Sequence, residues 1–247
     1  MIVKELNAKT VLSRSKVLDY TINPYVGCEH NCTYCYARFI KRFTGHRENW
    51  GEFVDVKINV PSLLQREIWK KKIGRVWISG LCDPYQPLEK EYELTRRCLE
   101  ILLRHSWPVT IQTKSPLVLR DIELLKRFST LEVTFSIATG NEDIRRLFEP
   151  SSPTLRERIE ALEKLRSEGI KTSVMIAPML PEAESLALQL RSIVDHVLID
   201  RMNYHYADWV YRRYNFEYAM TKHFFAEKKK ELSDAFEKEG IRCELLF

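Results

Sequence analysis

The stretch NPYVGCEHNCTYCY, residues 23–36, contains three of the six cysteines in this 247-residue chain. Cys28, Cys32 and Cys35 have the spacing C-x3-C-x2-C, which lets their thiolates face one metal centre from a single short loop. Thiolates are the usual ligands of iron–sulfur clusters. A structural zinc ion needs a fourth ligand, which His30 could provide, but His30 lies in a polar turn that could simply face solvent. Three ligands therefore favour a cluster with one open iron over a zinc knuckle or a disulfide cluster.

The composition is ordinary for a soluble globular protein. Hydrophobic residues make up 45% and charged residues 30% of the chain, which argues against a disordered or fibrous protein. At this length we expect one large α/β domain. The start of the chain lacks an apolar segment of signal-peptide length, and the longest apolar run, residues 174–180, is too short to span a bilayer. We therefore expect a cytoplasmic protein with no membrane partner.

The cysteine content agrees with metal ligation. Six cysteines in a chain without an export signal indicate reduced thiols rather than a disulfide framework. Cys98 shares a helical face with Leu94, Ile101 and Leu102, and Cys243 lies in the apolar run IRCELLF. We expect both to be core residues, because a buried cysteine behaves as a small hydrophobe.

The formal net charge of +5 is mild. A basic balance is compatible with a nucleic-acid partner, because Lys and Arg neutralise phosphates. It is equally compatible with anionic small molecules. Charge alone therefore does not decide between these partners.

Short apolar runs alternate with amphipathic helical patterns through most of the chain. A first strand is expected over residues 17–23, directly before the cysteine loop. Further strands are expected over residues 76–79, 109–113, 131–137, 172–177 and 196–199, and an extended segment over residues 54–60. Helices are expected over residues 36–43, 61–72, 91–105, 117–128 and 154–168. Gly169 closes the last of these helices as a C′ glycine.

Strictly alternating strands and helices predict a parallel sheet with right-handed crossovers. With the first strand included there are six β/α units, which could form an open doubly wound sheet or an incomplete barrel. In either fold, functional side chains gather at the carboxyl ends of the strands. There is no internal repeat and no convincing linker, so we expect a single domain over residues 1–247.

The cysteine spacing, with Tyr34 directly before the last cysteine, resembles the signature of the radical S-adenosylmethionine (SAM) superfamily. Three further segments resemble its spore photolyase-like branch, which is often labelled DNA-repair photolyase-like. They are SGLCDPYQPLE (79–89), QTKSP (112–116) and LFEPSSP (147–153). The resemblance covers roughly residues 19–203. It implies a partial (β/α)6 barrel of the TIM type, with a core over about residues 17–203 and an aromatic and helical extension over residues 204–247.

The resemblance also implies two cofactors. A [4Fe-4S] cluster would be held by Cys28, Cys32 and Cys35, and its open iron would be chelated by the amino and carboxylate groups of SAM. An electron from an external donor would cleave SAM to methionine and a 5′-deoxyadenosyl radical, which abstracts hydrogen from a substrate. The cofactors supply this chemistry, and the protein positions them.

The same resemblance implies SAM contacts at the strand ends. Lys114 is expected to contact the SAM carboxylate, and Ser136 the ribose or the methionine. Ser79 and Gly80 are expected near the amino end, and Tyr34 would contact adenine chiefly through its backbone. The alternative for Lys114 is a surface lysine before a turn.

Other residues near the strand ends have competing structural roles. Asp83 could bind SAM or a substrate amine, or could merely cap its turn. Met175 and Ala177 could line the adenine pocket, although Met175 could equally fill a gap in the core. Glu89 is a further carboxylate in the loop of Asp83.

Cys82 departs from the pattern T-D-P-Y-Q-P-x-E of this branch, in which threonine is common at its position. Spore photolyases use a cysteine near this strand end as a hydrogen-atom donor, although not at the matching position. Cys82 is therefore a candidate catalytic residue that could meet a radical or SAM. The alternative is a partly buried thiol beside the cluster loop.

Two segments are expected to be structural. Glu149 and Arg156 bracket the sequence EPSSPTLR, where we expect a helix-entry network with Ser152 as N-cap and Pro153 in the first turn. The tail YHYADWVYRRYNFEY, residues 204–218, is rich in aromatic residues. These could stack on bases of single-stranded nucleic acid, but we expect them chiefly to plug the open side of the barrel.

The sequence thus predicts a radical SAM enzyme, and the branch favours a nucleic-acid base as its substrate. One alternative is a non-catalytic zinc or iron–sulfur module that binds nucleic acid. Another is a SAM-cleaving enzyme that acts on a small metabolite or peptide. Fold analogy does not decide among them.

Overall fold

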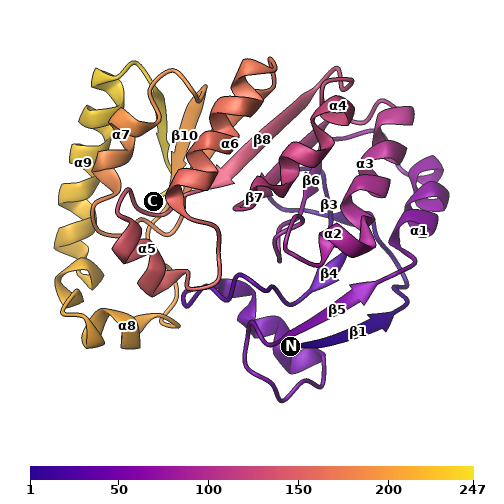
Figure 1. Cartoon of the computed structure of the whole chain (residues 1–247), viewed down its shortest axis with the longest axis horizontal. Coiled ribbons are helices and arrows are strands. Elements are labelled where there is room, and N and C mark those ends of the chain that lie inside the picture. The colour runs from indigo at the N-terminus through magenta and orange to yellow at the C-terminus, as the bar shows by residue number, and fades with distance from the viewer.

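The fold is built on one large sheet of eight strands (Figure 1). The computed structural model describes all of residues 1–247. The strands of this sheet are β2 (Ser13–Arg14), β3 (Tyr20–Ile22), β6 (Val76–Ile78), β7 (Val109–Thr113), β8 (Leu131–Ser136), β9 (Lys171–Ile176), β10 (His196–Ile199) and β11 (Arg242–Leu245). In space they follow the order β11-β10-β9-β8-β7-β6-β3-β2. All neighbours are parallel except β2 and β3, so the carboxyl ends of seven strands meet at one edge.

The six strands expected from the apolar runs are confirmed as β3 and β6 to β10. The outermost strands, β2 and β11, do not pair with each other, so the sheet forms an incomplete (β/α) barrel. β11 adds a seventh parallel strand outside the expected set. Cys243 lies on β11, where it is half-buried and packs against the edge of the hydrophobic core. The expected core position of Cys98 is confirmed, because its side chain is fully buried.

Helices connect successive strands and pack against the sheet. Those up to β9 are α1 (Val60–Glu67), α2 (Glu89–Tyr92), α3 (Leu94–Arg104), α4 (Ile122–Leu125), α5 (Glu142–Phe148) and α6 (Leu155–Ser167), with 3-10 turns η1 (Tyr36–Phe43), η2 (Ile68–Lys70) and η3 (Pro116–Asp121). The expected helix over residues 91–105 is divided at Glu93, whose φ is +47°. Thr154 and Glu157 form a capping box at the start of α6, and Gly169 with φ +76° follows its end.

The C-terminal part of the chain contains α7 (Leu186–Gln189), α8 (Asp208–Arg213) and α9 (Lys222–Lys238), with 3-10 turns η4 (Ala183–Ser185) and η5 (Glu217–Met220). α9 packs beside β11 and α7 at one side of the molecule (Figure 1). None of the helices is long and apolar enough to cross a membrane.

A second, smaller sheet supports the cysteine loop. It consists of β1 (Ile2–Leu6), β5 (Phe53–Lys57) and β4 (Tyr25–Val26), in the order β1-β5-β4. The expected extended segment over residues 54–60 therefore belongs to a different sheet from the other strands. β4 leads into the loop through Gly27, whose φ is +92° and where an added Cβ would lie 2.3 Å from the carbonyl oxygen of Phe53. Only glycine fits this close approach.

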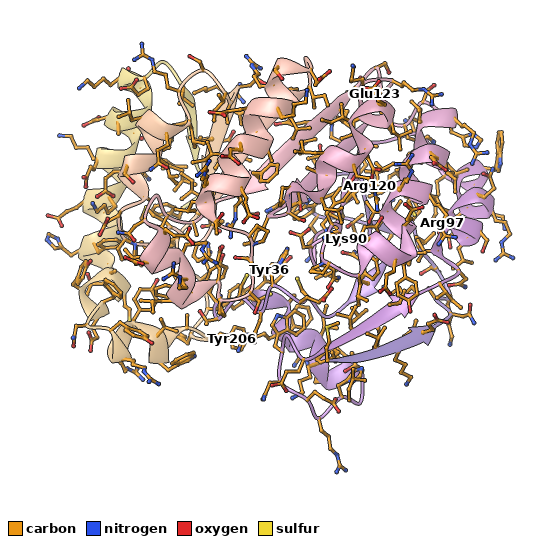
Figure 2. The ribbon with its side chains drawn as sticks, in the orientation of Figure 1. Tyr36, Lys90, Arg97, Arg120, Glu123 and Tyr206 are labelled. Atoms are coloured by element: carbon orange, nitrogen blue, oxygen red, sulfur yellow. The ribbon has the colours of Figure 1, made fainter.

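The aromatic tail does not plug the barrel as expected. Of its aromatic side chains, Tyr211 is buried and Phe216 is half-buried. The other five are exposed: Tyr204, Tyr206, Trp209, Tyr214 and Tyr218. Tyr206 lies near Tyr36 in Figure 2, and the rings of both residues neighbour that of Tyr204.

Candidate functional site

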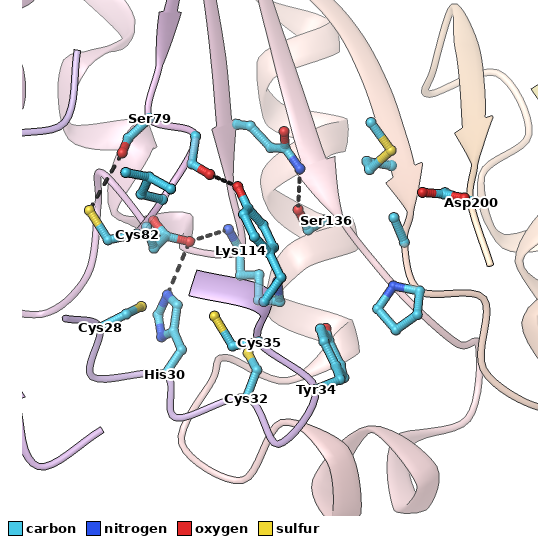
Figure 3. A pocket seen from close by; sticks show the side chains of 18 of the residues that line it. Cys28, His30, Cys32, Tyr34, Cys35, Ser79, Cys82, Lys114, Ser136 and Asp200 are labelled. Carbon is cyan, nitrogen blue, oxygen red and sulfur yellow. Dashed lines mark hydrogen bonds and ion pairs between the residues drawn. The ribbon is translucent and has the colours of Figure 1, made fainter. Parts of the chain in front are cut away.

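A pocket of about 500 Å³ opens at the carboxyl edge of the large sheet (Figure 3). It is lined by loops that follow β4, β6, β7, β8, β9 and β10. All twelve residues predicted from the sequence to bind a metal, bind SAM or act in catalysis line this pocket. They are Cys28, Cys32, Tyr34, Cys35, Ser79, Gly80, Cys82, Asp83, Lys114, Ser136, Met175 and Ala177. The structure thus brings these residues from five separate segments of the chain to one cavity.

The three loop cysteines lie on one wall of the pocket (Figure 3). All are free; Cys28 and Cys32 are buried and Cys35 is half-buried. Two turns shape the loop, because Asn31 N donates to Cys28 O and Cys35 N donates to Cys32 O. Burial raises the pKa of the Cys32 thiol to about 12, although the nearby ammonium group of Lys114 opposes the shift. The free chain therefore holds these thiols protonated, and a bound metal would have to supply the charge that favours thiolate.

The donor set fits a cluster. No group of three His, Cys, Asp or Glu side chains is gathered around a point where a single metal ion would bind. In a cubane each cysteine ligates its own iron, so the sulfurs stand further apart than the ligands of one zinc ion. Three thiols facing an open cavity would leave one iron accessible from the pocket.

His30 is buried, so the expectation that it could face solvent is wrong. Its side chain is only 3% exposed, and Nε2 lies 3.1 Å from Oδ2 of Asp83. This is an ion-pair distance, although the two atoms are not aligned as a hydrogen bond, and Nδ1 has no hydrogen-bond partner. The imidazole lies beside the cysteines and lines the pocket (Figure 3). It therefore ties the cysteine loop to the loop after β6.

Asp83 joins three strand ends. Its Oδ1 accepts hydrogen bonds from Tyr85 N at 2.9 Å and Thr113 Oγ1 at 2.6 Å, and its Oδ2 accepts from Lys114 N at 2.6 Å. Burial alone would raise the pKa of this carboxyl, but the charge of His30 and the hydrogen bonds lower it to about 2. The turn-capping role of Asp83 is present in the structure, whereas contact with SAM stays a prediction. Glu89, in contrast, lies outside the pocket lining and accepts from Tyr25, Thr95 and Arg96.

Lys114 and Tyr34 share a buried carboxylate, Glu149. The Tyr34 hydroxyl donates to Glu149, and Nζ of Lys114 lies 3.9 Å from Glu149 Oε1. Arg158 Nη2 donates to the other oxygen of Glu149 at 2.5 Å, and both of these side chains are fully buried. Burial opposes this charge, but Arg158 and Lys114 lower the pKa of Glu149 to about 2. Lys114 therefore faces the pocket from a fixed position.

The expected helix-entry network is only partly right. The N-cap of α6 is Thr154, not Ser152, because Thr154 Oγ1 accepts from Glu157 N. The hydroxyl of Ser152 instead bonds to Arg158 and Glu149. Arg156 is exposed and pairs with Glu160. Arg158 points inward from α6 and pairs with Glu149. Glu149 thus supports the pocket rather than the start of the helix.

The wall opposite the cysteines is formed by β8, β9 and β10. Ser136 is the register partner of Met175, and its hydroxyl accepts from Gln112 Nε2 at 3.1 Å. Met175 and Ala177 are half-buried and line the cavity, so Met175 does not fill a gap in the core. Asp200, after β10, lies at the far side of the view in Figure 3.

Cys82 is buried between the two sheets. Its thiol donates to Tyr25 O at 3.2 Å and lies 3.4 Å from Ser79 Oγ, which itself donates to Asn23 Oδ1 at 2.6 Å. Burial raises the pKa of Cys82 to about 11. Gly80 O accepts a hydrogen bond from the Tyr36 hydroxyl. The segment 79–82 is therefore bonded to both ends of the cysteine loop.

Some pocket residues lie outside the predicted set. Gln112 and Asp200 are polar residues at or directly after strand ends, which is the signal that identified Lys114 and Ser136. Applying that signal to β10 would have found Asp200. Tyr204 also lines the pocket and could be found only from the structure, because the tail carries no strand pattern.

Comparisons with known proteins agree with this geometry. The model of the Radical SAM superfamily matches residues 22–186. An uncharacterised protein of Methanocaldococcus jannaschii is 37% identical over 180 residues, which are 72% of this chain and 68% of that protein. A protein of Pseudomonas phage M6 described as a radical SAM Nalpha-GlyT isomerase is 25% identical over 219 residues, 86% of this chain and 45% of that protein.

Solved structures show the same fold. Spore photoproduct lyase complexed with dinucleoside spore photoproduct aligns with a TM-score of 0.74, covering 99% of this chain and 82% of that one. The sequence identity is 15%, so this likeness concerns the fold. Another structure of that lyase contains bound AdoMet. The chain spans only about half the length of several curated relatives, as for a Mycobacterium tuberculosis protein of which it covers 50%.

Proposed function

This chain belongs to the radical SAM superfamily, and from that premise we propose that it abstracts hydrogen from a nucleic-acid base. In this proposal Cys28, Cys32 and Cys35 hold a [4Fe-4S] cluster, and SAM binds in the adjoining pocket. The observation that carries the proposal is the convergence of three free thiols and nine further predicted residues on one cavity. Its volume of about 500 Å³ lies within the range of about 300–1,000 Å³ that is typical of small-molecule sites.

The polar wall offers groups for the charged end of SAM. Lys114 provides an ammonium group whose pKa is raised above its usual value: burial opposes the charge, but Cys32 and Glu149 outweigh it. A cation here would bind the SAM carboxylate. Ser79 and Gly80 lie across the cavity from Ser136 and are proposed for the amino end. Because Glu149 already holds Lys114 through an ion pair at 3.9 Å, little ordering is needed when SAM binds.

The opposite wall offers groups for the nucleoside end of SAM. Met175 and Ala177 present half-buried apolar surface, which suits a flat adenine ring. The Ser136 hydroxyl, oriented by Gln112, is available to the ribose or the methionine. Tyr34 is proposed to contact adenine through its backbone, since its hydroxyl is already bonded to Glu149.

When bound and reduced by an external donor, the cluster and SAM supply a carbon radical that removes a hydrogen atom from the substrate. The chain holds this chemistry away from water, because most of the cysteine loop is buried. We propose that Cys82 acts after SAM cleavage as a hydrogen-atom donor. Its thiol is kept protonated by burial, as such a donor requires.

Two comparisons support a nucleic-acid substrate. The aligned lyase was solved with a dinucleoside spore photoproduct, and the phage relative is described as an isomerase of Nalpha-GlyT. The net charge of +5 is compatible with phosphate groups. We transfer the substrate class, and not the particular lesion, to this chain.

Anaerobic reconstitution with iron and sulfide tests the proposal. We expect bound iron with a charge-transfer absorbance and, after addition of dithionite and SAM, formation of 5′-deoxyadenosine. Retention of zinc instead of iron, or a reduced cluster that yields no 5′-deoxyadenosine, would support a non-catalytic metal module. SAM turnover that is indifferent to DNA and RNA but rises with a metabolite or peptide would assign a different substrate class.

A further inference from the structure

Three tyrosine rings form a row that leads out of the pocket. The ring centroids of Tyr36 and Tyr204 are 6.0 Å apart with an interplanar angle of 21°, and those of Tyr204 and Tyr206 are 6.1 Å apart with an angle of 17°. The first two rings line the pocket and the third lies beyond it. We call these residues the tyrosine row. It is a nearly parallel set of ring faces that continues from the candidate site to the surface.

The row is not explained by folding. Its side chains are exposed by 38%, 49% and 38% of their area, in chain order. Tyr36 is bonded through its hydroxyl to Gly80 O, but the hydroxyls of Tyr204 and Tyr206 have no hydrogen-bond partner in the chain. A contiguous exposed aromatic patch on the rim of a pocket is typical of a binding surface.

Two arginines beside the row have no carboxylate partner. Arg201 lines the pocket mouth, and its side chain reaches only Asn203 Oδ1, at 3.4 Å. Arg38 lies two residues after Tyr36; its Nη2 donates to Cys32 O, and its buried Nε has no partner. Asp200, the nearest acid of the pocket, already accepts from Arg201 N and Asn203 Nδ2. Arg201, which is exposed and lies three residues before Tyr204, therefore places a positive charge at this end of the pocket.

We propose that the tyrosine row is a stacking platform for the unpaired bases of single-stranded nucleic acid, which it leads into the pocket. Parallel ring faces match a chain whose successive units are flat bases, and guanidinium groups match the phosphates between them. A peptide presents no such repeat of flat faces. A duplex hides its base faces, so the strand must be single or locally open. This inference rests on the proposed function in one respect: the pocket to which the row leads is taken to be the site of the reaction.

Fluorescence anisotropy tests the binding directly. The probes are a short labelled DNA oligonucleotide of mixed sequence, its RNA counterpart and the matching DNA duplex, each titrated with the full-length protein at several salt concentrations. Tyr206→Ala and Tyr204→Ala should each weaken single-strand binding about tenfold, because each removes one ring of the row. Tyr206→Phe and Tyr204→Phe should bind as the unaltered protein does, because the ring is kept.

Two controls separate stacking from other effects. Trp69→Ala removes an equally exposed ring, 73% exposed on η2 and outside the pocket, and should leave binding unchanged. Arg201→Gln should reduce the slope of log K against log salt by about one, whereas the Tyr→Ala variants should leave it unchanged. Circular dichroism of each variant verifies folding, so that a loss of binding in a misfolded variant is not counted.

The outcomes distinguish this inference from the proposed function. Equal binding of the duplex and the single strand, full binding by both Tyr→Ala variants, or equal losses for Ala and Phe would each overturn the platform. If the unaltered protein cleaves SAM but binds no oligonucleotide, the platform fails and the enzyme proposal stands. If it binds single strands through the row but cleaves no SAM, the platform stands and the enzyme proposal fails.

Discussion

The two sides of the pocket differ in how firmly their side chains are held. On the cysteine side, Asp83 and Glu149 are buried, and all four of their carboxylate oxygens have donors or cations within the chain. On the opening side, Tyr204, Tyr206 and Arg201 are exposed and make few contacts. Buried networks of this kind rigidify a site. The chain therefore holds the side chains around the proposed cofactors firmly, and it leaves the outer side of the pocket free to contact a substrate.

Removing a thiol from the cysteine side of the pocket should have the largest effect. Cys32→Ala should abolish cluster binding and with it all formation of 5′-deoxyadenosine, because the loop has no fourth cysteine to replace it. Iron content and visible absorbance after anaerobic reconstitution measure this. Cys98→Ser, buried away from the pocket on α3, should keep the cluster. A Cys32→Ala protein with full iron content would contradict the ligand assignment.

Removing the buried carboxylate should damage the rigid side next most. Glu149→Gln leaves the Arg158 guanidinium without its counter-charge, and breaking a buried ion pair costs about 3–5 kcal/mol. Urea unfolding of the metal-free protein measures the loss. The matched control is Glu160→Gln, whose partner Arg156 is exposed, and it should leave the unfolding midpoint unchanged. Similar midpoints for both variants would show that the network is not stabilising.

Lys114→Ala should separate SAM binding from cluster binding. We expect the cluster to remain, whereas the KM for SAM should rise between about tenfold and a hundredfold, because hydrogen bonds to charged groups contribute about 1.5–3 kcal/mol. The readouts are iron content and SAM titration of 5′-deoxyadenosine formation. Loss of the cluster in this variant, to the same degree as in Cys32→Ala, would mean that Lys114 supports the fold instead.

The carboxylate of Asp83 predicts a pH dependence. Its pKa in the folded chain is lowered to about 2, against about 3.9 in the unfolded chain. The unfolded state therefore takes up its proton first, so the stabilisation is fully present above about pH 4 and is lost as the pH falls through about 2. The loss is about 2–3 kcal/mol. In Asp83→Asn the free energy of unfolding should fall less steeply across this interval, as measured by urea unfolding at each pH.

The smallest effect on SAM cleavage is expected at Cys82. Cys82→Ala should preserve the cluster and 5′-deoxyadenosine formation if the thiol acts only in later hydrogen return. Chromatography of the nucleoside product provides the measurement. A variant that binds the cluster but no longer cleaves SAM would contradict this role and place Cys82 among the residues that shape the loop.

The sequence predicted the parts of the fold that follow from local periodicity. The six parallel strands were found because each is a short apolar run between amphipathic helices. β11 and the pairing of β1 with β5 depend on contacts between distant segments, which periodicity does not encode. A continuous helix was expected over residues 91–105, because the left-handed backbone of Glu93 does not alter the hydrophobic pattern.

The site could be predicted wherever polar residues follow a strand, and less well where a long-range partner decides the role. His30 looked like a residue of a polar turn, and only the position of Asp83 in space shows why it is buried. Glu149 and Arg158 are nine residues apart, and their pairing depends on how the loop before α6 folds back. The exposure of the aromatic tail was not predicted, because amino-acid composition does not show which way a side chain points.

The contacts that shape the cysteine loop do not involve sulfur. Thr33 bonds to Phe148 O, Tyr34 to Glu149, and Glu29 N to Gln86, so the loop is fastened to two other segments of the chain. A loop held in this way keeps its form when the metal is gone. We therefore expect the metal-free chain to present a preformed loop to iron and sulfide.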